Sequence, residues 1–381
     1  MPLQRRNLNY KKNIAVIPTS DCFLGNKLFS LDFNKENRHL GHINLKLRMN
    51  KINYKINTID MYEQFDDVDV ILFERVDYTY LKLFIRKYPM VKRVLIPWEP
   101  EVVSKEHSIE KLAKLKKYFD LILTWNDDLI DDMKFIKLNY RHHLNLYSSR
   151  IPDSKEFLKK KLLVQVSSNL KSNHPFELYS LRKKLNHLSE ERFGNDYSFY
   201  GSRWKSKTDS YKGVAQDKTQ TISNYRFSFC LENMKNVNGY ITEKIFDCFV
   251  AGVVPIYYGA SNITKYIPKE CFIDFRDFKD PSDLFDYLDS IKYEEWKQYL
   301  IEANKFLTGE KAYQFSIDYF INVVSEIVDN DFNREQIPRI SYIPICFKAF
   351  FQIQRRRLSK IKHLLISNTR RVIDKLGFNK Y

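Results

Sequence analysis

Short apolar runs that alternate with helical patterns constrain the fold of this 381-residue chain more than any other feature. Runs of this length, bounded by polar or turn residues, are typical of buried strands. Because strands that alternate with helices form parallel sheets covered on both faces, the pattern predicts an α/β fold. The predicted strands span residues 13–17, 69–73, 93–96, 121–125, 162–166, 197–200, 227–231, 253–258 and 271–275, and helical patterns between them include 108–118, 177–188 and 242–251.

A polar stretch at residues 148–155, which contains Pro152, divides the alternating pattern into two halves. A chain of this length supports two domains of about 100–200 residues each. We therefore predict two doubly wound domains that face each other across a cleft, formed by residues 1–155 and 156–330. Residues 331–381 are expected to form a separate tail.

More than half of the net charge of +16 lies near the carboxyl end, where residues 340–381 hold ten Lys or Arg against one acid. Apolar residues recur there at spacings near 3.5, and most basic residues take the other face. This pattern is typical of helices that lie on anionic membranes, so residues 345–376 are expected to bind such a surface. A helix packed on the body and a coiled-coil seam in a homodimer are the alternatives. The apolar face comprises Phe347, Phe350, Leu358, Ile361, Leu365, Val372 and Leu376.

The rest of the chain lacks the features of a nucleic-acid binder or an exported protein. Its aromatic residues lie inside apolar runs rather than among Lys and Arg on a strand face, which argues against a nucleic-acid partner. The amino-terminal sequence has no apolar signal core, no run approaches the ~18 apolar residues of a spanning helix, and the cysteines show no metal-ligand spacing. We expect a cytoplasmic protein, peripherally associated with the inner face of a membrane.

In parallel sheets, ligands bind beyond the carboxyl ends of the strands, so the loops after Ile96, Val166 and Leu231 are expected to carry the site. The third loop leads into a helix that Thr242 is placed to cap and Gly252 to end. The positive end of that helix dipole favours a diphosphate.

Two charged residues open this helix. Lys244 opposes the dipole in the first turn, which suggests an anion that the ammonium and the helix amides share. Glu243 is placed to accept hydrogen bonds from ribose hydroxyls. The alternative is an ordinary capped helix whose charged residues face solvent.

Residues 227–278 resemble the signature region of the α-1,3/4-fucosyltransferases of glycosyltransferase family 10. That signature consists of a strand ending in Glu-Asn, a Tyr-[Val/Ile]-Thr-Glu-Lys motif, a helix, an Ala-Gly-x-x-Pro-[Ile/Val]-x-x-Gly turn with a following Ser, and a strand leading to Asp-Phe. Every element occurs here in the same order. The matching residues are Glu232, Asn233, Tyr240 to Lys244, Ala251, Gly252, Pro255, Gly259, Ser261, Asp277 and Phe278.

The resemblance implies a GT-B fold, a GDP-fucose donor, inversion at the anomeric carbon and no obligatory metal, with a divalent ion at most stimulatory. Its donor-binding positions fall on Ser168, Asn233, Tyr240, Glu243 and Lys244. The implied acceptor is a glycan or glycolipid, with transfer to GlcNAc in an α-1,3 or α-1,4 linkage, for example in lipopolysaccharide. A GT-B transferase that uses a different nucleotide sugar, such as GDP-mannose, is the alternative.

An inverting transferase needs one base that deprotonates the acceptor hydroxyl as it attacks. Trp98-Glu99-Pro100 follows the strand at 93–96 and is similar to the Glu-Ser-Pro of the family, where the Glu is the base. The resemblance therefore implies Glu99, and burial beside Trp98 is expected to raise its pKa. Glu101 as the base, and Glu99 as a solvated loop acid, are the alternatives.

The sequence departs from the family after the strand at 162–166, because the arginine that pairs with phosphate is missing early in the next helix. Arg182, a turn or two later, is the expected substitute. Lys171 and Arg203 are the alternatives.

Three other polar motifs receive structural interpretations. Asp67-Val68-Asp69 is interpreted as a strand cap rather than a metal clamp. Asp127-Asp128 is interpreted as a pair that caps a helix start, and His142-His143 as polar surface residues.

Overall fold

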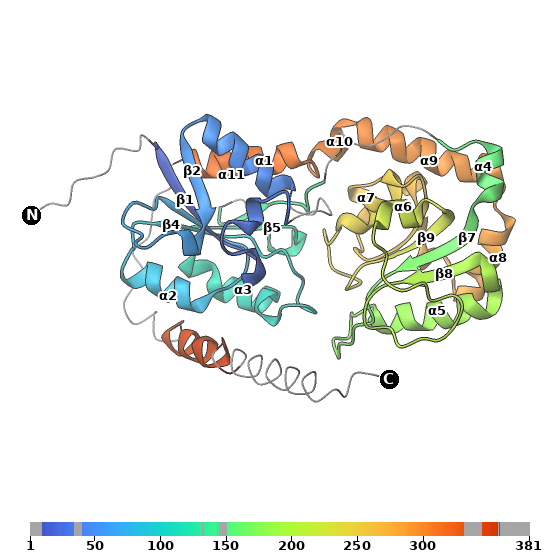
Figure 1. Ribbon diagram of the computed structural model, residues 1–381, viewed down its shortest axis with the longest axis horizontal. Coiled ribbons are helices and arrows are strands. Elements are labelled where there is room, and N and C mark those ends of the chain that lie inside the picture. Colours follow the sequence, from blue (N-terminus) through green and yellow to red (C-terminus); the bar gives the residue numbers. More distant parts are fainter. Residues whose placement is uncertain are drawn as a thin grey trace, which may run out of the picture.

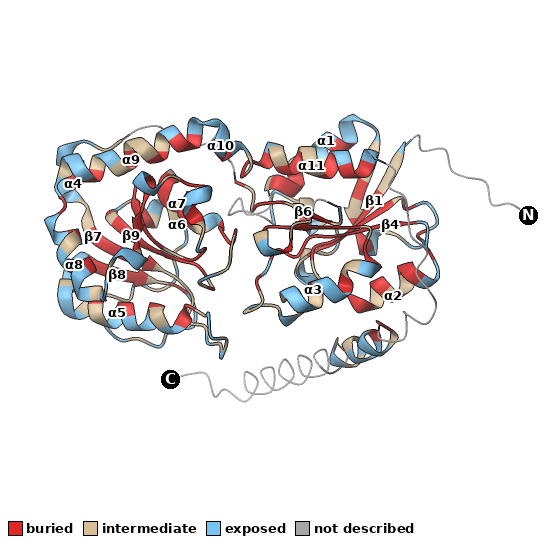
Figure 2. Cartoon of the chain, turned by 180° about the vertical axis from the view of Figure 1, so that it is seen from behind, coloured by how far each residue is buried: buried red, intermediate tan, exposed pale blue. Residues whose placement is uncertain are grey.

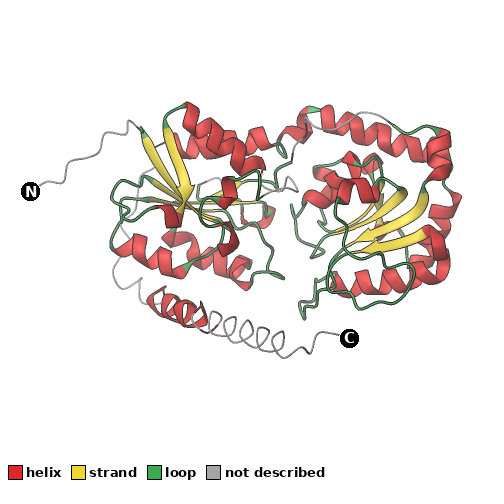
Figure 3. Cartoon of the chain, viewed as in Figure 1, coloured by secondary structure: helices red, strands yellow, loops and turns green. Residues whose placement is uncertain are grey.

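The computed structural model describes residues 10–33, 40–131, 133–142, 144, 151–330, 345–356 and 358. These residues form two α/β domains that lie side by side (Figure 1). In each domain, helices cover a sheet of parallel strands (Figure 3). The predicted α/β fold with two parallel-sheet domains is therefore confirmed. The predicted tail lies outside the described residues at 331–344, 357 and 359–381.

The sheet of the amino-terminal domain has six parallel strands in the order β2-β1-β3-β4-β5-β6. The four inner strands match the predicted strands to within one residue at each end. The edge strands β2 and β6 were not predicted, because they are half-exposed and lack a continuous apolar run. The strands are β1 Lys12–Ile17, β2 Tyr54–Thr58, β3 Val70–Phe73, β4 Lys92–Leu95, β5 Leu121–Thr124 and β6 Phe135–Lys137.

The sheet of the carboxyl-terminal domain has five parallel strands in the order β11-β10-β9-β7-β8. The strand predicted at 271–275 is reduced to two residues, because short 3-10 turns take up both of its ends. The strands are β7 Lys161–Val166, β8 Tyr197–Tyr200, β9 Tyr225–Leu231, β10 Val254–Tyr258 and β11 Ile273–Asp274.

The helices turn their apolar faces to the sheets, so the buried residues concentrate between the layers (Figure 2). In α7, Ile245, Phe246 and Phe249 are buried on one face, and Gly252 follows with a left-handed φ of 64°, as predicted. The helices are α1 Leu40–Lys51, α2 Tyr78–Arg86, α3 Ile109–Leu115, α4 Ser154–Lys159, α5 Tyr179–Phe193, α6 Lys218–Ile222, α7 Glu243–Val250, α8 Pro281–Ser290, α9 Tyr293–Thr308, α10 Glu310–Tyr313 and α11 Ile317–Asp329.

Helix α11 returns to the amino-terminal domain. Phe320 and Val324 are buried in the same cluster as Ile14 and Val70 of the amino-terminal sheet. The prediction that all of residues 156–330 belong to the carboxyl-terminal domain is therefore corrected. Apolar periodicity predicts that a helix has a buried face, but not which sheet that face covers.

The chain passes between the domains at two places, and the two connections touch. His142 N donates to Phe315 O at 2.6 Å, and Ile317 N donates to His142 O at 3.0 Å. A third hydrogen bond joins Asn139 Nδ2 to Gln314 Oε1 at 3.0 Å. The segment that leaves the amino-terminal domain is therefore hydrogen-bonded to the segment that returns to it.

The start of the tail, residues 345–356, is a helix that lies against α2 of the amino-terminal domain (Figure 1). Ile345 and Ala349 are buried in the apolar cluster that includes α2. Lys348 Nζ donates to Tyr78 Oη at 2.8 Å, and Arg356 Nη2 donates to Asp77 Oδ2 at 2.6 Å. This part of the tail is packed on the body, the first of the two alternatives. None of the helices within the described ranges has the length and apolar character needed to span a bilayer.

We expect Phe320→Ala to unfold the amino-terminal domain selectively, although the residue follows the whole carboxyl-terminal sheet in the chain. Its ring is 1% exposed and packs 5.9 Å from His42 and 6.0 Å from Trp98, measured between ring centroids. The free energy of unfolding should fall by about 3–5 kcal/mol. Hydrogen exchange should show the lost protection in β1 and β3 rather than in β9.

Leu158→Ala is the control for this variant, because Leu158 is 72% exposed. It should change the free energy of unfolding by less than about 0.5 kcal/mol. Loss of protection in β9 but not in β1 would show that α11 stabilises the other domain.

Candidate active site

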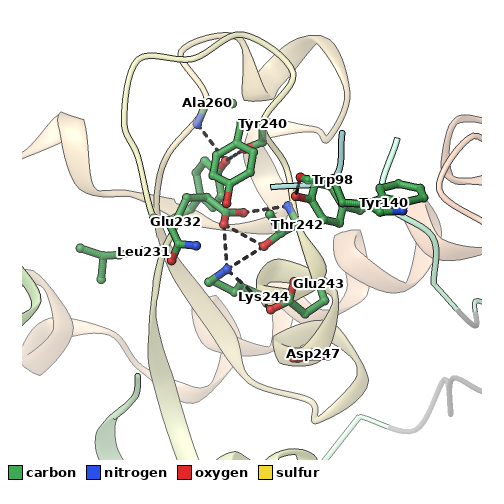
Figure 4. A network of polar contacts seen from close by, with 12 residues as sticks. Trp98, Tyr140, Leu231, Glu232, Tyr240, Thr242, Glu243, Lys244, Asp247 and Ala260 are labelled. Atoms are coloured by element: carbon green, nitrogen blue, oxygen red, sulfur yellow. Dashed lines mark hydrogen bonds and ion pairs between the residues drawn. The ribbon is translucent and has the colours of Figure 1, made fainter. Parts of the chain in front are cut away.

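The loop between β9 and α7 is organised around the carboxylate of Glu232 (Figure 4). This side chain is fully buried and accepts hydrogen bonds from Thr242 N at 2.8 Å, Thr242 Oγ1 at 2.7 Å and Lys244 Nζ at 3.0 Å. A buried carboxylate is costly unless it is paired and hydrogen-bonded, so these contacts fix the loop. Thr242 takes the predicted N-cap position, but its hydroxyl serves Glu232 rather than the helix amides.

The ammonium of Lys244 is held at the first turn of α7. Its Nζ lies 2.9 Å from Thr242 Oγ1 and 3.6 Å from the Glu243 carboxylate, and the side chain is 21% exposed. Burial alone would lower the pKa of Lys244, but the charges of Glu232 and Glu243 outweigh it and raise the pKa. The ammonium is therefore charged and fixed where the helix amides begin.

Lys218 of α6 is a second cation at this end of α7. Its Nζ donates to Asp247 Oδ2 at 2.6 Å. Desolvation opposes ionisation of Glu243, but Lys244 and Lys218 together lower the pKa of that carboxyl below its ordinary value. Lys218 was not predicted from the sequence, because it comes from a separate helix and no spacing motif marks the packing of α6 on α7.

Arg182 lies beneath the loop, where a small cavity opens at the carboxyl ends of β7 and β9. It is buried, and its Nη2 donates to Leu231 O and Glu232 O, both at 2.7 Å, and to Asn233 Oδ1 at 3.1 Å. The guanidinium therefore supports the loop and orients Asn233. Its contact with a phosphate stays a prediction. Polar residues of the cavity lining are Gln165, Ser167, Arg182, Lys218, Ser228 and Lys244.

The other site residues predicted in the carboxyl-terminal domain lie outside this cavity. Ser168 follows β7, is partly exposed and has its Oγ 2.9 Å from the Oγ of Ser202. Lys171 and Arg203, the alternatives for the phosphate contact, are exposed. Ser168, Lys171 and Arg203 are not among the residues that line the cavity.

Glu99 follows β4 on the amino-terminal domain and has an exposed side chain. Desolvation by the surrounding protein raises the pKa of its carboxyl, Lys244 lowers it in part, and Glu243 raises it further. The direction agrees with the prediction, but Glu99 is exposed rather than buried beside Trp98, so its role as the base stays a prediction. Both of these charges belong to the first turn of α7, on the opposite domain.

An aromatic cluster joins the two domains at the loop between β9 and α7. The Tyr240 ring is 1% exposed and lies 4.7 Å from the Trp125 ring and 6.1 Å from the Tyr140 ring, between centroids. Met234 of the loop between β9 and α7 completes the cluster. Tyr240, predicted to bind the donor, thus packs on the amino-terminal domain, and its contact with a donor stays a prediction.

Asp127 links the domains with its carboxylate. It accepts hydrogen bonds from Asn262 Nδ2 at 2.7 Å and Tyr266 Oη at 2.5 Å, both on the carboxyl-terminal domain, and from Lys137 Nζ at 2.5 Å. The short 3-10 helix that starts here is capped by Asn126. The interpretation of Asp127 as a capping residue is therefore wrong. Local sequence shows a helix start but not a partner more than a hundred positions away.

The remaining motifs have structural roles. Asp69 Oδ2 accepts a hydrogen bond from Asn13 N at 2.7 Å, which agrees with a strand cap. His142 is buried and stacks on Phe246 at 4.0 Å, so its interpretation as a surface residue is wrong, and His143 lies outside the described residues. Within the described ranges, no three His, Cys, Asp or Glu side chains are grouped to hold a metal ion.

Solved structures share this arrangement of domains. A crystal structure of an α1,3-fucosyltransferase with GDP aligns with a TM-score of 0.57 and 16% identity, covering 88% of this chain and 96% of that one. A crystal structure of an α1,3-fucosyltransferase with GDP-fucose aligns with a TM-score of 0.54 and 16% identity, covering 87% of this chain and 95% of that one. The architecture is that of the GT-B glycosyltransferases, which confirms the predicted fold class.

Sequence comparison finds a family match in the second half of the chain. Residues 157–341 match the family model described as "Glycosyltransferase family 10 (fucosyltransferase) C-term". Residues 157–341, just under half of the chain, are therefore similar to the carboxyl-terminal domain of glycosyltransferase family 10, which confirms the predicted resemblance.

Curated relatives match over a shorter stretch. Alpha-(1,3)-fucosyltransferase FucT of Helicobacter pylori is 34% identical over 73 residues, which are 19% of this chain and 15% of that protein. The 4-galactosyl-N-acetylglucosaminide 3-alpha-L-fucosyltransferase 9 of Homo sapiens is 41% identical over 73 residues, 19% of this chain and 20% of that protein. The match thus spans at most a fifth of the length of these relatives.

We expect Glu243→Gln to lower the pKa of Glu99, because it removes a negative charge that disfavours ionisation of that carboxyl. A titration followed by carboxyl-carbon NMR measures the shift, and the Glu99→Gln spectrum identifies the resonance. Glu294→Gln is the control, since Glu294 is 79% exposed on α9. An unchanged Glu99 pKa in Glu243→Gln would show that the two carboxylates do not face each other.

Proposed function

We propose that this protein is a fucosyltransferase that moves L-fucose from GDP-fucose to a hydroxyl of a glycan acceptor. The observation that carries the proposal is the Glu232–Thr242–Lys244 arrangement at the start of α7, within the family 10 domain. The similar structures of α1,3-fucosyltransferases with GDP and with GDP-fucose support this donor.

The donor diphosphate is proposed to bind at the first turn of α7. The amides of a helix N-terminus and the Lys244 ammonium both favour an anion there. Lys244 is held by Glu232 and needs little reorganisation to meet a phosphate, which lowers the entropy cost of binding. Asn233, oriented by Arg182, together with Ser168, Tyr240 and Glu243, is proposed to complete the donor contacts, with Glu243 on the ribose.

Glu99 is proposed as the general base of an inverting transfer. Its carboxylate removes the proton of the acceptor hydroxyl while that oxygen attacks the anomeric carbon, and GDP leaves from the opposite face of the sugar. The raised pKa of Glu99 supports this role because it makes the carboxylate a stronger base, and Glu99 belongs to the domain opposite Lys244. Lys244 and Tyr240 are proposed to stabilise the leaving GDP.

The acceptor is proposed to be a GlcNAc-type residue of a glycan or glycolipid, fucosylated through an α-1,3 or α-1,4 linkage. The names of the relatives, which specify α-1,3-fucosyl transfer, support this class. Lipopolysaccharide is one acceptor of this chemistry.

Two variants separate donor binding from transfer. Lys244→Ala should weaken GDP affinity by about 10–100-fold, because the diphosphate loses a charge-assisted partner. Glu99→Gln should leave GDP affinity unchanged and lower transfer by about 10²–10⁴-fold. Calorimetry with GDP and a transfer assay with GDP-fucose measure the two effects.

Lys184→Ala is the control for Lys244→Ala, because Lys184 is exposed on α5. A thermal-shift panel of GDP-fucose, GDP-mannose and UDP-sugars tests the donor. Stabilisation by GDP-mannose with no response to GDP-fucose would replace the proposed donor. Equal GDP affinity in Lys244→Ala and wild type would contradict the proposed diphosphate site at Lys244.

We also propose that the protein binds the inner face of an anionic membrane through its tail, from the cytoplasm. The described part of the tail supports this, although its orientation differs from the predicted one. Lys348 and Arg356 face the body, whereas the phenylalanines of the helix face outward. The exposed fractions are 64% for Phe347, 56% for Phe350 and 60% for Phe351. Such a patch of apolar rings is suited to the headgroup boundary.

The variant Phe347→Ser/Phe350→Ser/Phe351→Ser should lose binding to phosphatidylserine vesicles in a sedimentation assay while it retains GDP affinity. Leu158→Ser is the control, because this exposed leucine lies on α4. Light scattering without vesicles tests the homodimer. A dimer in wild type that dissociates in the triple variant, with vesicle binding unchanged, would assign the patch to a subunit interface.

A further inference from the structure

Three neighbouring strands of the amino-terminal sheet end in aromatic residues that converge at one point. Trp98 follows β4, Trp125 follows β5 and Tyr140 follows β6. Because parallel strands have their carboxyl ends at one edge of the sheet, adjacent strands bring these side chains together. Figure 4 shows Trp98 and Tyr140 beside the loop between β9 and α7, which is proposed to bind the donor and is called the donor loop below.

The main chain at Glu99 is held by hydrogen bonds to two successive carbonyl groups. The carbonyl of Trp98 accepts hydrogen bonds from Trp125 Nε1 at 2.9 Å and from the Tyr140 hydroxyl. The next carbonyl, that of Glu99 itself, accepts one from Nδ1 of the buried His107 at 2.7 Å. The backbone from which the carboxylate projects is therefore fixed by three side chains.

The same two aromatic side chains contact the donor loop. The ring of Tyr240 lies 4.7 Å from the ring of Trp125 and meets the ring of Tyr140 edge to face at 6.1 Å, both measured between centroids. Tyr240 lies two residues before Thr242, whose amide and hydroxyl are bound by Glu232. A continuous path of contacts thus runs from the donor loop through Tyr140 to the peptide of Glu99.

We propose that Tyr140 is a positioning residue, which couples the donor loop to the peptide of Glu99 and so holds the carboxylate at the acceptor hydroxyl. The inference rests on the proposed function, in which Glu99 is the base. A base must lie within hydrogen-bond reach of the proton that it removes, and a displacement of about 1 Å costs on the order of 10²-fold in rate. Tyr140 contacts the peptide of Glu99 on the amino-terminal domain and Tyr240 of the donor loop on the carboxyl-terminal domain. It therefore links the proposed base to the loop that is proposed to hold the donor.

Tyr140→Phe tests this role, because it removes the hydroxyl and keeps the ring. The turnover number for fucose transfer should fall by about 10-fold while GDP affinity and the KM for donor stay within about twofold of wild type. Tyr62→Phe is the matched control. The Tyr62 hydroxyl also donates to a main-chain carbonyl of the same domain, that of Ile14 at 2.8 Å, and it does not belong to the path.

A double-mutant cycle with Glu99→Gln separates positioning from general stability. In the Glu99→Gln background, Tyr140→Phe should have no further effect on turnover, because the carboxylate that it positions is already gone. An equal fall in both backgrounds would overturn the proposal, as would wild-type turnover in Tyr140→Phe or a matching loss in Tyr62→Phe.

A failure of the positioning role of Tyr140 can be distinguished from a failure of the proposed function. If wild type transfers fucose and Glu99→Gln does not, the base is established and the cycle tests Tyr140 alone. If Glu99→Gln retains full turnover, the assignment of the base fails, and with it the positioning role. If wild type transfers no fucose, the proposed function itself fails.

Discussion

The buried carboxylate of Glu232 is the interaction on which the rest of the site depends. It lies at the end of a central strand, has no exposure to water, and meets the main chain and hydroxyl of Thr242 and the ammonium of Lys244. Removing one partner of such a group leaves a buried charge uncompensated, at a cost of about 3–5 kcal/mol. The loop and the first turn of α7 are therefore fixed before any ligand arrives, and Lys244 is kept charged by the same contact.

Apolar periodicity predicted the inner strands of both sheets because those strands are buried on both faces and read as continuous apolar runs. It missed β2 and β6, which are edge strands with partly polar sequences. It also placed α11 in the wrong domain. The amphipathic face of that helix is clear in the sequence, but the choice between two sheets depends on the path of the chain.

The residues of the site also fall into two groups, those that a sequence motif predicted and those that only the fold brings together. Glu243 and Lys244 belong to one contiguous motif, so a short sequence could reveal them. Lys218, Tyr140 and Asp127 act through partners that the fold brings from other elements, and nothing in their neighbours along the chain marks that role. Tyr240 shows a further limit, because a motif gives the position of a residue but not which way its ring points.

The return of α11 means that the domains are joined by two covalent connections instead of one. These connections are hydrogen-bonded to each other at His142, Phe315 and Ile317, so they form a double-stranded hinge. A single cut in either connection would therefore leave the two domains covalently attached through the other.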